Sequence, residues 1–189
     1  MKRVVVTGMA GITSLGSDWP SIAANFAANR SGIRRMDEWN RFDELNTRLA
    51  GPVDDFAVPS NWTRKQLRSM GRVSRLAVAA SQNALLDAGL LDDPSIRDGR
   101  MGVACGSSTG STEDIKAFGN MLLNSVAEGL NANPYVRMMP HTTAANISIF
   151  FGLTGRLIPT SSACTSGSQG IGYAYEAGSY THLRAHETP

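Results

Sequence analysis

The apolar residues of this chain fall into short continuous runs that alternate with longer stretches of helical spacing. The continuous runs predict buried strands at Val4–Gly8, Gly102–Cys105 and 157–163. Apolar residues three and four positions apart predict helices at Pro20–Asn29, Thr63–Ala88, Glu113–Ala127, His141–Phe150 and 165–178. Because strands alternate with helices, the pattern indicates an α/β fold with a mainly parallel sheet.

Polar residues and glycines mark the ends of these elements. Asp18 is the expected N-cap of the first helix. Gly89 is expected to end the longest helix. Residues 30–61 and 131–140 show neither periodicity, so both stretches are expected to be irregular.

The last predicted helix is rich in glycine, with Gly167, Gly170 and Gly172 close together. Each glycine costs a helix about 1 kcal/mol relative to alanine. Close approach of another backbone in a crowded layer is one physical reason to accept that cost. The alternative interpretation is a loop over residues 165–172.

Composition is that of a globular protein. The chain has 189 residues, of which 42% are apolar, enough for one compact domain. The formal net charge of +2 is too small to indicate a nucleic-acid partner. Two cysteines do not form a disulfide framework, so a reducing cytoplasm is the expected location. Thr7 and Gly8 interrupt the first apolar run too early for a signal peptide, and no stretch approaches the ~20 apolar residues of a membrane span.

Cys164 carries the strongest chemical signal. It lies among small residues between the predicted strand 157–163 and the predicted helix 165–178, where a tight turn exposes a side chain. The positive end of that helix favours the thiolate, and a thiolate can carry an acyl group as a thioester. Local chemistry alone leaves a nucleophile and a structural cysteine as equal alternatives, since most intracellular cysteines are small buried hydrophobes. Cys105, inside a predicted strand, is expected to be structural.

Four ordered segments identify a family resemblance. They are the opening strand and turn at 2–16, the small-residue loop Gly106–Ser111, the segment Phe151–Gly155, and Ala163–Gly167 around the cysteine. In this order they resemble the β-ketoacyl-acyl-carrier-protein synthases, the condensing enzymes of fatty acid and polyketide assembly. The resemblance covers residues 1 to about 178 and is strongest to the elongating synthases of the bacterial type II system. Departures at Ala10, Pro159 and 161–162 bear on subfamily and chain length rather than on the family.

The resemblance implies a fold and a reaction. The fold is the first half of a thiolase-like fold, in which two α/β halves with mainly parallel mixed sheets pack face to face. Residues 1–178 would form this N-terminal domain, and 179–189 look like an unrelated or out-of-frame tail. The reaction is decarboxylative Claisen condensation of an acyl thioester with malonyl-carrier protein in fatty acid biosynthesis. Cys164 would be the nucleophile, and its backbone N–H would be one donor of the oxyanion hole.

The resemblance also bears on what this chain can do alone. Enzymes of this kind use two His and one Lys besides the cysteine, and the motifs that carry them belong to the second half. The chain alone is therefore expected to be acylated at most. The parent is expected to be a homodimer paired through about 156–163, without a metal or redox cofactor, because phosphopantetheine arrives on the acyl carrier protein.

A basic stripe occupies the longest predicted helix at Arg64, Lys65, Arg68, Arg72 and Arg75. Without the family, such a run indicates a solvated helix face. By resemblance, Arg64, Lys65 and Arg68 would dock the acidic carrier protein, an encounter that opposite charges steer.

By the same resemblance, Thr109 in the small-residue loop would line the acyl tunnel; its alternative role is turn geometry alone. A second hypothesis for the whole chain is a non-catalytic carrier-binding or pairing subunit of a fatty acid or polyketide synthase. The presence of Cys164 favours the enzyme.

Three other hypotheses have less support. The dinucleotide fingerprint G-x-G-x-x-G is absent after the first predicted strand. His182 and His186 stand four apart without a third metal ligand, and no pattern orients either of them as a base for Cys164. His141 lies outside the family's motifs and is expected to cap a helix or pack locally.

Overall fold

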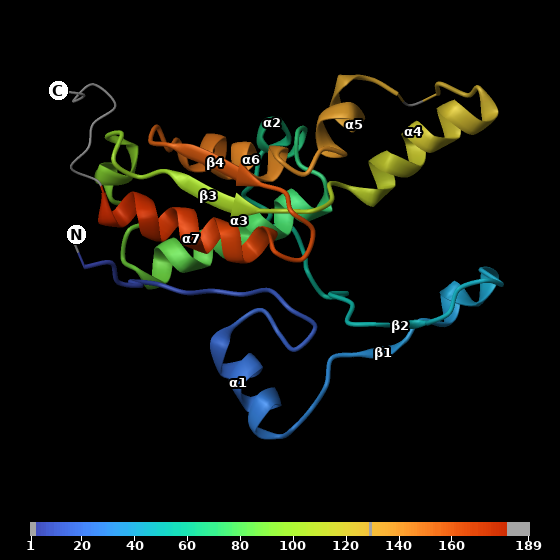
Figure 1. Cartoon of the computed structure of the whole chain (residues 1–189), viewed down its shortest axis with the longest axis horizontal. Helices are drawn as coiled ribbons and strands as arrows, with labels where there is room; N and C mark the ends of the chain where they lie inside the picture. Colours follow the sequence, from blue (N-terminus) through green and yellow to red (C-terminus); the bar gives the residue numbers. More distant parts are fainter. Residues whose placement is uncertain (1–2, 129, 181–189) are drawn as a thin grey trace.

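The computed structural model describes residues 3–128 and 130–180 (Figure 1). Its centre is a pair of parallel strands, β3 (Val103–Gly106) and β4 (Leu157–Thr160). Parallel neighbours require a long crossover, which runs here through α4 (Thr112–Asn124), α5 (Ala132–Arg137) and α6 (Thr142–Phe151). The α/β architecture predicted from the sequence is present around this pair of strands.

Helices pack on the two central strands. Both α6 and α7 (Ser166–Ser179) contact β3 and β4, and α3 (Arg72–Asp87) packs on α6. In Figure 1, α1, β1 and β2 lie apart from this centre. The other elements are α1 (Trp19–Ala27), β1 (Arg34–Arg35), the 3-10 helix Asp37–Arg41, β2 (Leu49–Ala50), α2 (Arg64–Leu67) and the 3-10 helix Pro94–Arg97.

The hydrophobic core lies where α3, α6 and β3 meet. Val78 of α3 and Ile96 are almost fully buried, and burial of such a side chain contributes roughly 1.5–3 kcal/mol. The Trp62 and Phe150 rings meet with their centroids 4.8 Å apart, and Phe150 meets Phe151 edge-on at 4.9 Å. Of the two central strands, β3 packs against this core.

The predicted helix Thr63–Ala88 is interrupted, which corrects the sequence prediction. The helix α2 ends at Leu67, and α3 begins at Arg72 after a break around Gly71. A Cβ at Gly71 would lie 2.5 Å from the Cβ of Ser111, so only glycine fits this close approach. The apolar spacing continues through the break because Met70 is buried in the core although it is not helical.

A buried polar network holds the break in place. Ser69 Oγ donates to Asn146 Oδ1 at 2.8 Å, and Asn146 Nδ2 donates to the Ser69 carbonyl and to Ser74 Oγ, both at 3.1 Å. Asn146 belongs to α6 and is buried, so each of these bonds is made away from bulk water.

Two further predictions are wrong. Val4–Gly8 is not a strand, and Val5 and Val6 are exposed, because the segment runs along helices rather than beside a strand. A Cβ at Gly8 would lie 2.4 Å from the Ala84 carbonyl oxygen of α3. The stretch 131–140 is also not a simple loop, because α5 forms within it with Asn131 as N-cap.

Other local predictions are confirmed. The Asp18 side chain accepts the Ser21 N–H at 2.8 Å and caps α1, and Gly89 with φ +68° follows α3. The glycine-rich stretch is helical as α7. A Cβ at Gly170 would lie 3.2 Å from the Gly106 nitrogen, which supports close approach there, whereas open space surrounds Gly167. Within residues 3–128 and 130–180, no helix is long and apolar enough to cross a membrane.

Candidate active site

Cys164 lies in the turn that joins β4 to α7, and its side chain is exposed. The residue before it, Ala163, has φ +49°, in the left-handed region. This region costs a residue other than glycine about 1 kcal/mol, so the surrounding structure must hold it. The predicted sharp bend is therefore present, one residue before the cysteine.

Ser166 holds this turn from inside. Its hydroxyl donates to the Ala163 carbonyl at 2.6 Å and accepts the Ser162 N–H at 2.8 Å. Ser166 is only 3% exposed, and its own carbonyl accepts a bond of 2.8 Å from the Thr160 hydroxyl. These bonds fix the backbone on both sides of Cys164 and leave the cysteine side chain facing out.

The small-residue loop after β3 lies against the same turn. Ser108 Oγ donates to the Ala163 carbonyl at 2.9 Å. A Cβ at Gly106 would lie 2.1 Å from the Ser166 carbonyl oxygen, so the start of α7 presses on the end of β3. Thr109 is exposed in this loop, and its carbonyl accepts a bond from Ser107 Oγ at 3.0 Å. The structure thus brings the loop that carries Thr109 beside the Cys164 turn.

Sequence reasoning singled out Cys164 and did not identify the residues that hold it. Ser108, Thr160 and Ser166 are common residue types in small-residue segments, and no spacing rule pairs them. The available signal was their position beside the two predicted strand ends, where parallel strands bring loops together.

Cys105 occupies a different environment in β3. It is half-buried and packs against the hydrophobic core. Burial raises the pKa of the Cys105 thiol, because the charged thiolate is poorly solvated there. Its neighbour across the strand pair is Pro159.

The basic residues separate into two groups at the break between α2 and α3. Arg64, Lys65 and Arg68 are exposed, and none of their side chains forms an ion pair within the described part of the chain. The backbone carbonyl of Arg68 accepts two bonds from Arg137, from Nε at 3.0 Å and from Nη2 at 2.6 Å. Arg72 and Arg75 lie beyond the break, in α3. The prediction that all five basic residues lie on one helix is therefore wrong.

The histidines add no site to the described residues. His141 stands at the N-cap of α6, but its exposed side chain makes no capping hydrogen bond, so that part of the prediction is wrong. His182 and His186, like most of the predicted tail 179–189, lie outside the described residues. Among residues 3–128 and 130–180, no group of three or more His, Cys, Asp or Glu side chains is placed to hold a metal ion.

The turn, the loop beside it and the parallel strands beneath match a known protein family. A model of the beta-ketoacyl synthase N-terminal domain matches residues 1–177. The chain belongs to the beta-ketoacyl synthase family. The expected fold class, the first half of a thiolase-like α/β fold, is confirmed with it.

Two curated proteins are similar to this chain along nearly its whole length. The 3-oxoacyl-acyl-carrier-protein synthase 2 of Vibrio harveyi is 33% identical over 175 residues, 92% of this chain and 41% of that protein. Nodulation protein E of Rhizobium meliloti (strain 1021) is 34% identical over 187 residues, covering 93% of this chain and 43% of that protein.

A solved member is still more similar. The crystal structure of a beta-ketoacyl synthase from Burkholderia phymatum STM815 has a TM-score of 0.89 and 59% identity over 94% of this chain and 43% of that one. The chain therefore spans less than half the length of each of these three proteins.

Proposed function

We propose that this chain is the nucleophile-bearing half of a β-ketoacyl-acyl-carrier-protein synthase that extends acyl chains in fatty acid biosynthesis. The observation that carries the proposal is the exposed Cys164 on a turn whose backbone is held by the buried Ser166. An exposed thiol on a fixed backbone can meet an incoming thioester without rearrangement of the loop.

In the first step, the Cys164 thiolate attacks the thioester carbonyl of an acyl-carrier protein. The carbonyl becomes a tetrahedral oxyanion, which the backbone N–H of Cys164 would stabilise as one donor. Collapse of this intermediate expels the carrier thiolate and leaves the acyl group as a thioester on Cys164. No electron is gained or lost, and the phosphopantetheine stays on the carrier.

The second step extends the chain by two carbons. Malonyl-carrier loses CO₂, and the resulting carbanion attacks the Cys164 thioester to give β-ketoacyl-carrier and the free Cys164 thiolate. The family resemblance assigns the groups that stabilise the carbanion to two His and one Lys outside this chain. We therefore propose that this chain alone takes up an acyl group and does not complete the condensation.

The carrier protein would dock on Arg64, Lys65 and Arg68. All three side chains are exposed and free of ion pairs within residues 3–128 and 130–180, so they are available to an acidic partner. Charge reversal at all three positions is expected to abolish carrier binding at low salt, whereas reversal at the exposed Arg30 is the matched control. Unchanged carrier binding by the triple variant would contradict the docking assignment.

Two finer assignments complete the proposal. Thr109 would line the path of the acyl chain, since its loop is tied to the Cys164 turn through Ser108. A homodimer would form through β4, which pairs with β3 on one edge and has no other strand partner among the described residues. An unpaired edge favours strand addition by a second copy.

Transfer from an acyl-carrier protein tests the proposed function. The chain is incubated with an acyl-carrier protein, and intact-protein and peptide mass spectrometry then locate the acyl group. The expected result is one acyl thioester on Cys164, lost in Cys164→Ala and kept in Cys105→Ala. Carrier binding without acylation of Cys164 would instead favour the non-catalytic carrier-binding or pairing subunit.

A further inference from the structure

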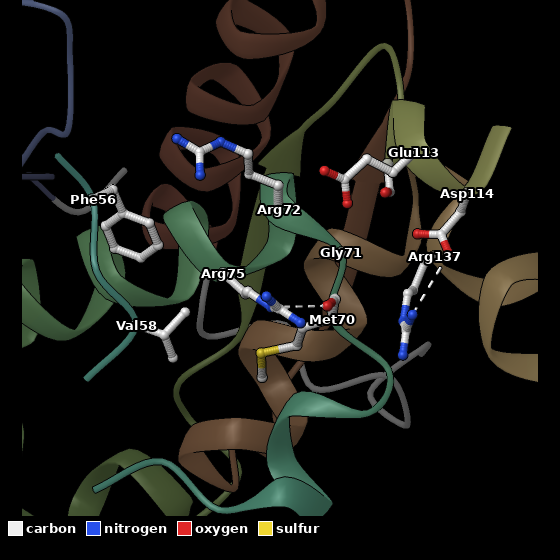
Figure 2. Close-up of a pocket in the computed structure, with 10 residues that line it drawn as sticks. Phe56, Val58, Met70, Gly71, Arg72, Arg75, Glu113, Asp114 and Arg137 are labelled. Carbon is white, nitrogen blue, oxygen red and sulfur yellow. Dashed lines mark hydrogen bonds and ion pairs between the residues drawn. The ribbon is translucent and has the colours of Figure 1, made fainter. Parts of the chain in front are cut away.

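A polar cavity that Cys164 does not line lies where the first turns of α3 and α4 meet α5. Its volume is about 250 Å³, below the roughly 300–1,000 Å³ typical of sites for drug-sized ligands. Figure 2 shows Arg72, Arg75 and Arg137 around it, with Phe56 and Val58 on the apolar side. The size fits a small ligand and the guanidinium groups favour an anionic one.

Two helix N-termini open onto this cavity. Gly71 is the N-cap of α3 and Ser111 is the N-cap of α4, and neither helix has a side-chain hydrogen bond that caps it. The first-turn N–H groups of a helix have no partner within the helix and carry its partial positive charge. Their convergence with the arginines raises the local potential for an oxyanion.

The Ser111 side chain adds an uncommitted hydrogen-bond donor to the cavity lining. The residue is only 3% exposed and lines the cavity, yet its hydroxyl makes no hydrogen bond with any described residue. A hydroxyl without a protein partner that lines a cavity is free to donate to a ligand there. An oxyanion in the cavity would accept this hydroxyl's proton in a hydrogen bond.

The three arginines differ in how many of their guanidinium N–H groups are already bonded to protein groups. Arg137 forms an ion pair of 3.5 Å with Asp114, and Arg72 donates to the Val53 carbonyl. Arg75 donates from Nε to the Met70 carbonyl at 3.1 Å, and its two terminal nitrogens have no partner within residues 3–128 and 130–180 (Figure 2). Arg75 is therefore the guanidinium with donors to spare for a ligand.

The carboxylates that line the cavity set the limit on its affinity. Asp114 is balanced by Arg137, whereas Glu113 lines the cavity without an ion-pair partner among the described residues. The five charged side chains that line the cavity carry three positive and two negative charges, which leaves it formally cationic. Removal of the Glu113 charge should strengthen anion binding.

We propose that this cavity is a binding site for a small oxyanion, a phosphate or carboxylate group, held by Ser111, Arg75 and the first turns of α3 and α4. The inference does not depend on acyl transfer to Cys164. Arg75 would bind this anion, whereas the other basic residues assigned a role in the same stripe would dock the carrier protein.

Isothermal titration of inorganic phosphate into the chain at low ionic strength tests the site, with acetate as a second arm that separates phosphate from carboxylate. Saturable binding is expected at one site, weaker by at least about tenfold in Arg75→Gln and tighter in Glu113→Gln. Arg30→Gln, the same charge change at an exposed position, should bind as the parent chain does.

Ser111→Ala keeps the test decisive if Arg75→Gln fails to fold. This variant removes a hydroxyl that makes no protein hydrogen bond, so the fold should persist while phosphate and acetate binding both weaken. The proposal is overturned if neither anion shows saturable binding, if Ser111→Ala binds as the parent chain does, or if Arg30→Gln weakens binding as much as Arg75→Gln.

Discussion

Cys105 and Cys164 are the two cysteines of the chain, one inside a central strand and the other just beyond the end of its neighbour, and their environments are opposite. Cys105 is the third residue of β3, half-buried against the core, and its thiol has a raised pKa. Cys164 follows the end of β4 and is exposed. The contrast teaches that position relative to the strand end, rather than residue type, decides which thiol can meet a substrate.

The two regions are joined at Gly106, which follows Cys105 and lies beneath the start of α7. We expect Gly106→Ala to destabilise the chain most, by about 3 kcal/mol or more, because its Cβ would lie 2.1 Å from a backbone oxygen of Ser166 that cannot simply move aside. Chemical denaturation measures this loss. Gly167→Ala is the control, since open space surrounds that position and alanine favours a helix. Equal stability of the two variants would contradict the close contact.

The next largest effect is expected when only the support of the Cys164 turn is removed. Ser166→Ala loses both hydroxyl hydrogen bonds and leaves the Ser162 N–H unpaired, which should cost about 1–3 kcal/mol. It should also change the alkylation rate of Cys164 and leave that of Cys105 unaltered, as measured by peptide mass spectrometry. Ser168→Ala, an exposed change in the same helix, should alter neither quantity.

A smaller effect is expected at Ala163. Ala163→Gly should stabilise the chain by about 0.5–1 kcal/mol, because glycine adopts φ +49° without the clash that alanine suffers. Ala174→Gly in the exposed face of α7 should instead destabilise it by about 1 kcal/mol. Thermal unfolding of the pair checks both signs. A destabilising Ala163→Gly would mean that the turn is not strained.

The smallest effect concerns the pH dependence of stability at Cys105. Its pKa is raised in the folded chain, so the unfolded chain loses this proton first as the pH rises. The stability contributed by the neutral thiol is thus complete below the unfolded pKa and declines as the pH rises through the folded value. Denaturation curves recorded over a range of pH give the free energy of unfolding, and Cys105→Ala should make its alkaline decline shallower. If the decline with pH is as steep in the variant as in the parent chain, Cys105 is not its cause.

The same contrast explains how much the sequence could predict. The strands Val103–Gly106 and Leu157–Thr160 and the helix α7 follow from short apolar runs and periodicity, because these signals come from neighbouring residues within each element. The exposure of Cys164 was predictable from its place after a strand among small residues.

The failures of prediction share one physical origin, which is tertiary contact. The break at Gly71 depends on close approach by Ser111 and on the Asn146 network, and neither is visible in a window of neighbouring residues. Val4–Gly8 has a strand-like composition, yet no strand lies beside it in the described structure. The serines that hold the Cys164 turn were missed for the same reason.

The central claim is that the fold presents Cys164 and protects Cys105. Brief labelling of the folded chain with iodoacetamide at neutral pH, followed by quantification of both cysteine peptides, tests it directly. The account predicts that Cys164 is alkylated at least about a hundredfold faster, because Cys105 must await local opening of the core. Comparable rates for the two thiols, or faster labelling of Cys105, would contradict it.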